Sequence, residues 1–492
     1  MKELIRKIEE GTEVRNNLSD LVSRVKEEGT KPFYEEVKDA PTFLYRLFNN
    51  EDPKVRKNAA KLAELLPDNA LIGILWEALA KEGTRYVRPA ILLGFKGKDI
   101  SELKPDFKMN RDRLLKAEVS QEDRKHVLEE IQAYNDLLVS PVLGKHRFKP
   151  NLRPVDVLLT SVPEAREVLF SSVAEEKKKL VAPGVMVRTA SPEELRKNRL
   201  YKELFFVLPG LNELPEDPYV LADKIASGKL TEFLKMYHDG DPVWRYRVNL
   251  RIPMEDRKKN LFLKRFTGEL SRLSGGKLIN DGANYELELR ILSVNRSVRV
   301  LIGLATLKDD RFSYRKGTVA ASIHPVDAAV MMKVMEPHFR KNSQVLDPFC
   351  GVGTMLIERN MISPISPVYG IDTFGEAIDK AEVNLKKAGL RVNLIQRDFF
   401  DFRHDYLFDE IITNMPFTLS EDHSEIERLY RNFFVKAKEH LKEDGMLFLY
   451  AREPELVREC APGFGYRIIE DFPMHKKENA AAFALSLLPE KQ

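Results

Sequence analysis

The spacing of hydrophobic residues divides the chain into three segments. In residues 1–140, apolar positions recur at the spacing of amphipathic helices, with turn residues between the runs. Residues 145–315 alternate between strand-like and helix-like patterns, and residues 318–492 repeat this alternation more regularly. The pattern predicts a multidomain protein with an α-helical N-terminal region, an α/β middle domain and a C-terminal doubly wound α/β domain.

Two stretches of the helical region are similar to each other. Val55 and Arg56 lead into a segment rich in alanine and leucine, and Val87 and Arg88 do the same with equal spacing. This arrangement resembles a HEAT-type helical repeat, in which small residues form the packing face. An ordinary helical bundle accounts for it nearly as well, so both alternatives stay open for residues 1–140.

The middle segment contains several short predicted elements. We expect helices over 164–178 and 258–273, and strands over 155–160, 204–208, 246–252, 285–291 and 298–304. The order strand, helix, strand, strand in its second half resembles the C-terminal half of a THUMP-type RNA-binding domain. The resemblance implies that this α/β domain binds RNA.

Local charge in the middle segment agrees with such a role. Between positions 245 and 299, 13 basic residues outnumber 6 acidic ones, and a basic cluster can hold RNA phosphates. The alternative is a solvated helix face without a ligand. The residues expected to contact RNA are Arg257, Lys258, Lys259, Lys264 and Arg265.

A glycine turn between a strand and a helix marks a nucleoside site in the C-terminal segment. The strand over 345–347 ends in an acid, and a tight turn with two glycines then opens a helix. Leu356 stands where a dinucleotide-binding turn has its third glycine, which argues against NAD. The residues expected at this turn are Asp347, Phe349, Cys350, Gly351, Gly353 and Thr354, with Cys350 as a small packing residue.

Acidic residues follow the next two predicted strands. Asp372 ends the strand over 368–372, at a distance from the glycine turn that suits an acceptor for ribose hydroxyls. Asp398 follows the strand over 392–395 and could accept the amine of an adenine, which Phe399 would cover. A single acid in such a place is more often a helix cap, but three in register on successive strands favour a nucleoside site.

The fourth predicted strand, over 408–413, runs into a loop suited to a planar amine. Asn414 offers a side-chain oxygen to the amine, Met415 offers the carbonyl before Pro416, and Phe417 offers a ring. The loop resembles the Asp/Asn-Pro-Pro-aromatic signature of amino-methyltransferases, with methionine at the second position. We therefore expect Asn414, Pro416 and Phe417 to form the catalytic loop.

Composition excludes several other classes of protein. The chain has 492 residues, enough for several domains, and a net charge of +3, too small to indicate nucleic-acid binding by itself. Its two cysteines, Cys350 and Cys460, supply neither a thiolate zinc site nor a disulfide framework. No leader peptide and no long apolar run occur in the sequence. We expect a cytoplasmic protein without a metal and without membrane contact.

The C-terminal motifs together are similar to those of the UPF0020 family of RNA guanine-N2 methyltransferases, in which a THUMP domain precedes the catalytic domain. The similarity extends to the lead-in segment over 314–317 and 321–329. It implies a class I methyltransferase fold with a seven-stranded sheet, S-adenosylmethionine as cofactor and structured RNA, tRNA or rRNA, as partner. It also implies that Ser322 and His324 contact the methionine end of the cofactor.

Three classes of function are compatible with these residues. The first is methylation of the N2 amine of a guanosine in tRNA or rRNA. The second is methylation of a DNA adenine or a protein glutamine, because the loop at Asn414 suits any planar amine. The third is a catalytically weak RNA-binding scaffold, for which Met415 is the sole indication. A protein partner of the helical N-terminus also stays open.

Overall fold

The computed structural model describes residues 1–117, 119–120, 122–138, 146–240, 243–295, 297–417 and 424–489. Residues 139–145, where the expected helical region gives way to the middle segment, lie outside these ranges. Contacts between Cα atoms group the chain into two compact units, one of residues 1–149 and 208–306 and the other of residues 150–207 and 307–492. Both units combine segments that are distant in the sequence, a division that differs from the three consecutive segments expected from the sequence. The three-segment division stays a prediction.

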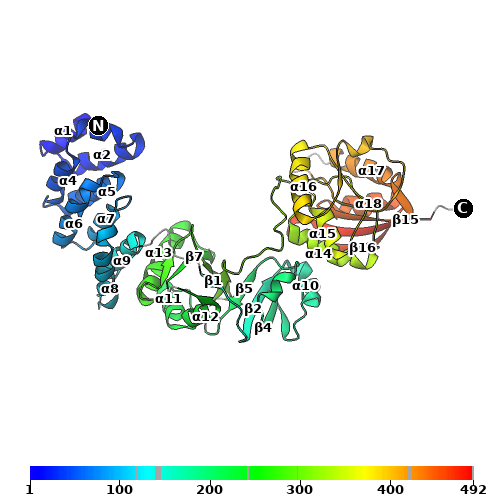
Figure 1. The fold of residues 1–492 in the computed structure, drawn as a ribbon, viewed down its shortest axis with the longest axis horizontal. Coiled ribbons are helices and arrows are strands. Elements are labelled where there is room, and N and C mark those ends of the chain that lie inside the picture. The colour runs from blue at the N-terminus through cyan, green and yellow to red at the C-terminus, as the bar shows by residue number, and fades with distance from the viewer. Residues whose placement is uncertain are drawn as a thin grey trace. The chain divides into compact units, whose positions relative to one another are not determined.

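The N-terminal region of the first unit is built from helices around one apolar core (Figure 1). Its described residues between 1 and 138 contain no strand. Buried leucines and phenylalanines from successive helices fill the core, as the helical spacing predicted. The helices are α1 (Lys2–Glu9), α2 (Val14–Glu28), α3 (Lys31–Glu36), α4 (Ala40–Phe48), α5 (Pro53–Leu65), α6 (Ile72–Lys81), α7 (Arg88–Leu93), α8 (Lys104–Lys116) and α9 (Arg124–Leu138).

The two similar stretches make equivalent ion pairs. Arg56 lies in the first turn of α5, and its Nε donates to Glu82 over 2.8 Å; Arg88 begins α7, and its Nε donates to Glu130 over 2.8 Å. Both glutamates are buried, so each needs its arginine to offset desolvation. The internal similarity therefore extends to the packing, whereas assignment to the HEAT class stays a prediction.

The first unit also contains the second half of the middle segment. Strands β7 and β9 pair in parallel, β8 extends the sheet beside β7, and β10 pairs with β9 in the antiparallel sense. Helix α13 contacts both α11 and α9. The elements are α11 (Pro218–Ser227), α12 (Leu230–Tyr237), β7 (Trp244–Arg251), α13 (Asp256–Leu273), β8 (Leu278–Asn280), β9 (Leu287–Val294) and β10 (Ser297–Leu304), with β1 (Arg147–Phe148) pairing with β6 (His238–Asp239).

The second unit starts with a four-stranded antiparallel arrangement in the order β3, β4, β2, β5. The elements are β2 (Val155–Thr160), α10 (Arg166–Ser172), β3 (Lys178–Val181), β4 (Gly184–Thr189) and β5 (Leu204–Val207). Here the predicted helix over 164–178 was wrong in its second half, because α10 ends at Ser172. The Lys178 ammonium donates to the Phe170 carbonyl over 2.9 Å, which satisfies the end of the helix and leaves the chain free to form the β3–β4 hairpin.

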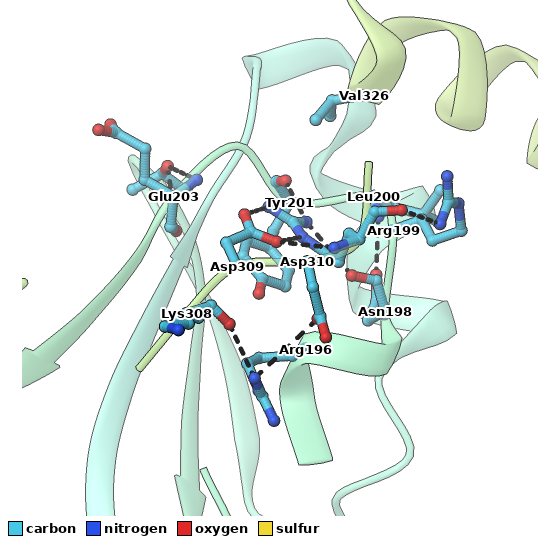
Figure 2. Close-up of polar contacts among 12 residues, drawn as sticks. Arg196, Asn198, Arg199, Leu200, Tyr201, Glu203, Lys308, Asp309, Asp310 and Val326 are labelled. Carbon is cyan, nitrogen blue, oxygen red and sulfur yellow. Dashed lines mark hydrogen bonds and ion pairs between the residues drawn. The ribbon is translucent and has the colours of Figure 1, made fainter. Parts of the chain in front are cut away.

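Arginines connect residues 196–203 to the C-terminal part of the same unit (Figure 2). The Arg196 guanidinium donates to the Lys308 carbonyl over 2.7 Å. Arg311 donates to the Tyr201 carbonyl over 2.8 Å, with its guanidinium 3.5 Å from the centre of the Tyr201 ring. Arg199 makes a two-pronged contact of 2.9 and 2.6 Å with the buried carboxylate of Glu358 on α15 (Thr354–Ile362). Residues 150–207 are therefore fixed to the C-terminal domain by charged hydrogen bonds.

The C-terminal domain is a doubly wound sheet of seven strands, as predicted. The order is β13, β12, β11, β14, β15, β17, β16, and the first five strands are parallel whereas β17 is antiparallel to both of its neighbours. The strands are β11 (Val345–Asp347), β12 (Val368–Asp372), β13 (Asn393–Gln396), β14 (Phe408–Asn414), β15 (Leu441–Ala451), β16 (Tyr466–His475) and β17 (Ala480–Leu487).

Two clusters of buried apolar side chains pack in this domain. One joins the sheet to the α17 and α18 side, and the other lies among α15, α16 and Tyr314. The helices are α14 (Pro325–Met335), α15, α16 (Gly375–Ala388), α17 (Ser424–Lys438) and α18 (Pro454–Gly463). Helix α17 ends at Lys438, because the Phe408 amide donates to the His440 carbonyl over 2.7 Å and Leu441 already pairs with β14.

Candidate active site

The predicted glycine turn lies between β11 and α15, at the carboxyl edge of the parallel strands. Gly351 and Gly353 have φ angles of 50° and 79°, a left-handed conformation that favours glycine. A Cβ on Gly353 would also lie 3.2 Å from Leu385, so side chains are disfavoured there for two reasons. The turn thus presents backbone rather than side chains to the space above the sheet edge.

Asp372, at the end of β12, holds this turn in place. Its Oδ2 accepts a hydrogen bond from the Gly351 amide over 2.8 Å, and its Oδ1 accepts one from the Phe374 amide over 2.9 Å. Each carboxylate oxygen can accept a second bond. Asp372 therefore fixes two loops and keeps acceptor capacity toward the adjoining cavity.

A cavity of about 280 Å³ opens beside Asp372. It is lined by residues from four segments that are distant in the sequence, namely the lead-in segment, the glycine turn, the loop after β12 and the loop after β14. The predicted site residues that line it are Ser322, Phe349, Cys350, Gly351, Thr354, Asp372, Asn414, Pro416 and Phe417. The structure therefore brings together most of the residues that the sequence predicted for cofactor and base.

Other predicted site residues do not line this cavity. His324 caps α14, where its Nδ1 accepts from the Val326 amide over 3.3 Å. Asp398 is exposed and caps a short helix by accepting from the Phe400 amide over 2.9 Å. Phe399 is buried, with its ring centre 5.9 Å from that of Phe349. Gly353 belongs to the glycine turn but does not line the cavity.

Asp347 is fully buried and connects the two strands that lead into the site. Its Oδ1 accepts from the Thr413 hydroxyl over 2.7 Å and from the Phe349 amide over 3.2 Å. Its Oδ2 has no hydrogen-bond partner among the described residues. Burial raises the pKa of this carboxyl to about 7, although both hydrogen bonds act in the opposite direction. Asp347 is thus a positioning residue under the cavity.

Cys350 is a packing residue, as expected for its place in the turn. Its side chain is buried, and a Cβ on Gly370 of the neighbouring strand would lie 3.0 Å from the sulfur. Burial raises the pKa of the thiol well above its ordinary value. A buried, protonated thiol is unsuited to nucleophilic chemistry.

Two residues near the site were missed by the sequence analysis. Phe374, two positions after Asp372, lines the cavity and is 51% exposed, which is unusual for so large an apolar side chain. Its position just after the predicted ribose acceptor was the available signal. Arg452 places its guanidinium 4.3 Å from the centre of the Phe417 ring and pairs with Glu478 over 3.2 Å. No local pattern marks Arg452, because it follows a buried strand and meets Phe417 only in the fold.

The predicted RNA-binding residues lie on α13 in the first unit. Arg257 and Lys258 are exposed in its first turn, and Lys259 follows them. Lys264 pairs with Glu129 of α9 over 2.6 Å, and Arg265 is exposed beside it. The structure therefore brings these five residues onto one helix, and their contact with RNA stays a prediction.

The fold and the cavity together define an α/β domain of the class I methyltransferase type. Residues 313–480 match the model of the UPF0020 family, described as RMKL-like, methyltransferase domain. The C-terminal part of the chain thus matches the UPF0020 methyltransferase domain, as the sequence motifs predicted. The match begins at residue 313, after the N-terminal helices and nearly all of the middle segment. It therefore describes this domain alone.

A curated relative is similar over part of the same chain. The tRNA (guanine(10)-N2)-dimethyltransferase of Methanothermobacter thermautotrophicus is 32% identical over 115 residues, which are 23% of this chain and 34% of the relative. The aligned region thus spans about a third of the length of that relative.

Solved structures share the fold over a larger part of the chain. TrmN from Thermus thermophilus is 20% identical, with a TM-score of 0.52 over 68% of this chain and 100% of that chain. A predicted N6-adenine-specific DNA methylase from Listeria monocytogenes is 14% identical, with a TM-score of 0.51 over 68% and 97% of the two chains. Both similarities concern the fold alone, and they extend beyond the methyltransferase domain.

The described part of the chain has neither a metal-ligand cluster nor a membrane-spanning helix. Its His, Cys, Asp and Glu side chains form no group of three or more that could hold a metal ion. None of its helices combines the length and the apolar character needed to cross a bilayer.

The buried carboxyl of Asp347 predicts a pH-dependent stability. Between about pH 4 and pH 7 the folded state holds a proton that the unfolded chain has released, so the free energy of unfolding falls as the pH rises. Asp347→Asn removes this loss. Relative to wild type, the variant should gain up to about 4 kcal/mol between pH 4 and pH 8, measured by urea unfolding at each pH.

The exposed Asp401→Asn provides the control, because it removes a carboxylate of the same domain that is not buried. Its difference from wild type should stay constant across this range. If the difference in unfolding free energy between Asp347→Asn and wild type also stayed constant with pH, the raised pKa of the buried Asp347 carboxyl would be contradicted.

Proposed function

We propose that this chain is an S-adenosylmethionine-dependent RNA methyltransferase that methylates the N2 amine of a guanosine in structured RNA, tRNA or rRNA. The observation that supports this most strongly is the convergence of Asp372, the glycine turn and the Asn414–Phe417 loop on one cavity. A nucleoside acceptor, an open backbone turn and a planar-amine site are what such a transfer needs within a few ångströms.

The residues around the cavity fit the cofactor. Asp372 has acceptor capacity for ribose hydroxyls, and the exposed ring of Phe374 offers an apolar face beside it. The left-handed turn at Gly351 lets the backbone approach a ligand closely. Ser322 also lines the cavity, where it could contact the amino-acid end. The bound cofactor would supply an electrophilic methyl group.

The loop after β14 would hold the acceptor base. Asn414 would accept a hydrogen from the amine through its side-chain oxygen, and the Met415 carbonyl would accept the other. Both bonds leave the nitrogen lone pair directed toward the methyl group rather than conjugated with the ring. Phe417 would stack on the base, and Arg452 holds its ring from the other side. Water would take the released proton.

Methionine at the second loop position does not weaken the loop. Its side chain is fully buried, and its amide donates to the Tyr450 carbonyl of β15 over 2.9 Å. A proline there could not donate this hydrogen bond. Burial and the sheet therefore supply the rigidity that the usual proline supplies, which argues against the alternative of a catalytically weak scaffold.

The choice of guanosine in RNA rests on the relatives and on the predicted middle domain. The relative that is similar in sequence is named as a tRNA guanine-N2 dimethyltransferase, whereas the DNA adenine methylase is similar in fold alone. The basic helix α13 in a predicted THUMP-like domain favours RNA over DNA or protein. Methylation of a DNA adenine or a protein glutamine remains the second candidate, because the loop itself accepts any planar amine.

Cofactor affinity tests the role of Asp372. Asp372→Ala removes two acceptor oxygens, and hydrogen bonds to a charged group are worth about 1.5 to 3 kcal/mol, so affinity should fall about tenfold or more. Calorimetry with S-adenosylmethionine measures this directly. Asp401→Ala is the matched control, since Asp401 is exposed and lies outside the cavity, so this variant should leave the affinity unchanged. Equal affinities for wild type and Asp372→Ala would place the cofactor elsewhere.

Single-turnover kinetics at saturating RNA tests the catalytic loop. Asn414→Ala and Phe417→Ala remove the amine acceptor and the stacking ring, so each should lower the methyl-transfer rate by at least about tenfold while RNA affinity changes little. Asn414→Asp and Phe417→Tyr keep an acceptor and a ring and should retain more activity than the alanine variants. Wild-type rates in both alanine variants would exclude this loop as the reaction site.

A further inference from the structure

A groove of about 890 Å³ lies within the first unit, between the N-terminal helices and α13. Helices α5, α7 and α9 form one side, and α13 forms the other. Apolar side chains such as Leu93 and Leu128 line its floor. The groove therefore connects the helical region, for which the sequence left a protein partner open, with the helix on which it predicted RNA contacts.

Positive charge dominates the rim of the groove. Six cationic side chains line it, against the three acids Glu64, Glu129 and Asp136. Two of the cations are neutralised, because Lys264 pairs with Glu129 and Arg124 pairs with the buried Glu269. The other four make no ion pair with any residue that the structure describes, and they are Lys57, Lys61, Lys125 and Arg265.

Aromatic rings hold two of the cations at the groove. The Lys57 ammonium lies 5.3 Å from the centre of the Tyr86 ring, and the Arg124 guanidinium lies 4.6 Å from the centre of the Tyr219 ring. Such contacts favour ordered positions for long side chains. The unpaired charge of Lys57 is thereby arranged before a ligand arrives, which lowers the entropic cost of binding.

The walls of the groove are rigidly joined. A Cβ on Gly268 of α13 would lie 3.2 Å from the Leu128 side chain of α9, so the two helices are in close contact. One turn further along, the Asn135 amide donates to the buried Ser271 hydroxyl over 2.6 Å. Helices that pack through a glycine and a buried hydrogen bond keep a fixed separation, so the width of the groove is set by the fold.

The predicted RNA contacts on α13 continue this wall. Leu261, Lys264 and Gly268 line the groove at helical spacing, and Arg257 lies one turn before Leu261 on the same side of the helix. From Arg257 to Arg265 the helix rises by about 12 Å. The basic side chains thus form a continuous tract from the start of α13 into the groove.

We propose that this groove binds the sugar–phosphate backbone of the RNA substrate, and that the N-terminal helices are part of the RNA-binding surface. This inference rests on the proposed function and extends it to a part of the chain outside the methyltransferase family match. The four unpaired cations favour a polyanion over an apolar peptide, which would leave them without partners. Phosphate contacts of this kind position RNA without reading its sequence.

RNA affinity of the full-length chain tests the proposal. The triple variant Lys57→Ala, Lys61→Ala, Lys125→Ala removes three of the unpaired cations. Its affinity for purified bulk tRNA should fall at least about tenfold near 0.1 M salt, and the slope of log affinity against log salt should fall by about 2 to 3. The matched control replaces Lys2, Lys26 and Lys38, which are exposed on the same helical region outside the groove. It should keep wild-type affinity and slope.

Calorimetry with S-adenosylmethionine separates a failure of the groove proposal from a failure of the proposed function. The groove variant should bind the cofactor as tightly as wild type, which shows that its methyltransferase domain is folded. Wild-type RNA affinity and slope in the groove variant would overturn the groove proposal and leave the proposed function intact. A wild-type chain that binds the cofactor but no tRNA or rRNA would overturn both, and an equal loss in the control variant would show general electrostatics rather than a site.

Discussion

The hydrogen bond from the Gly351 amide to the Asp372 carboxylate is the interaction on which the candidate site depends. It joins the turn after β11 to the end of β12 and holds a left-handed backbone beside the cavity. The buried Asp347 acts in the same way between β11 and β14 through Thr413. Three strand ends are thereby fixed relative to one another, so the Asn414 loop and the nucleoside acceptor share one small space.

Much of the C-terminal domain could be predicted because its signals are local. The strand over 368–372 and the glycine turn are specified by short runs of residues, and the structure has both at the predicted positions. The burial of Phe399 and the capping role of Asp398 could not be read locally, because an aromatic or acid after a strand fits either role. The role of Arg452 could not be predicted from the sequence either, because its contact with Phe417 arises only from the pairing of β15 with β14.

Two features of the remaining chain, the β3–β4 hairpin and the groove beside α13, could not be predicted from the sequence. The hairpin of β3 and β4 was missed because its first strand is rich in lysine, and the Lys178 side chain that ends α10 has no local signature. The groove beside α13 was likewise hidden, because its cations come from α5, α9 and α13 and meet only in the fold. What the sequence did indicate was the basic character of α13, which the structure extends into a surface shared with the helical region.

The central claim is that the cavity methylates the N2 amine of a guanosine in RNA. Mass spectrometry of nucleosides from total tRNA and rRNA, in cells lacking this chain, tests it most directly. We expect these cells to lose an N2-methylated guanosine. Expression of the wild-type chain should restore it, and expression of the Asn414→Ala variant should not. Unchanged N2-methylguanosines, together with loss of a methylated adenine from DNA, would contradict it.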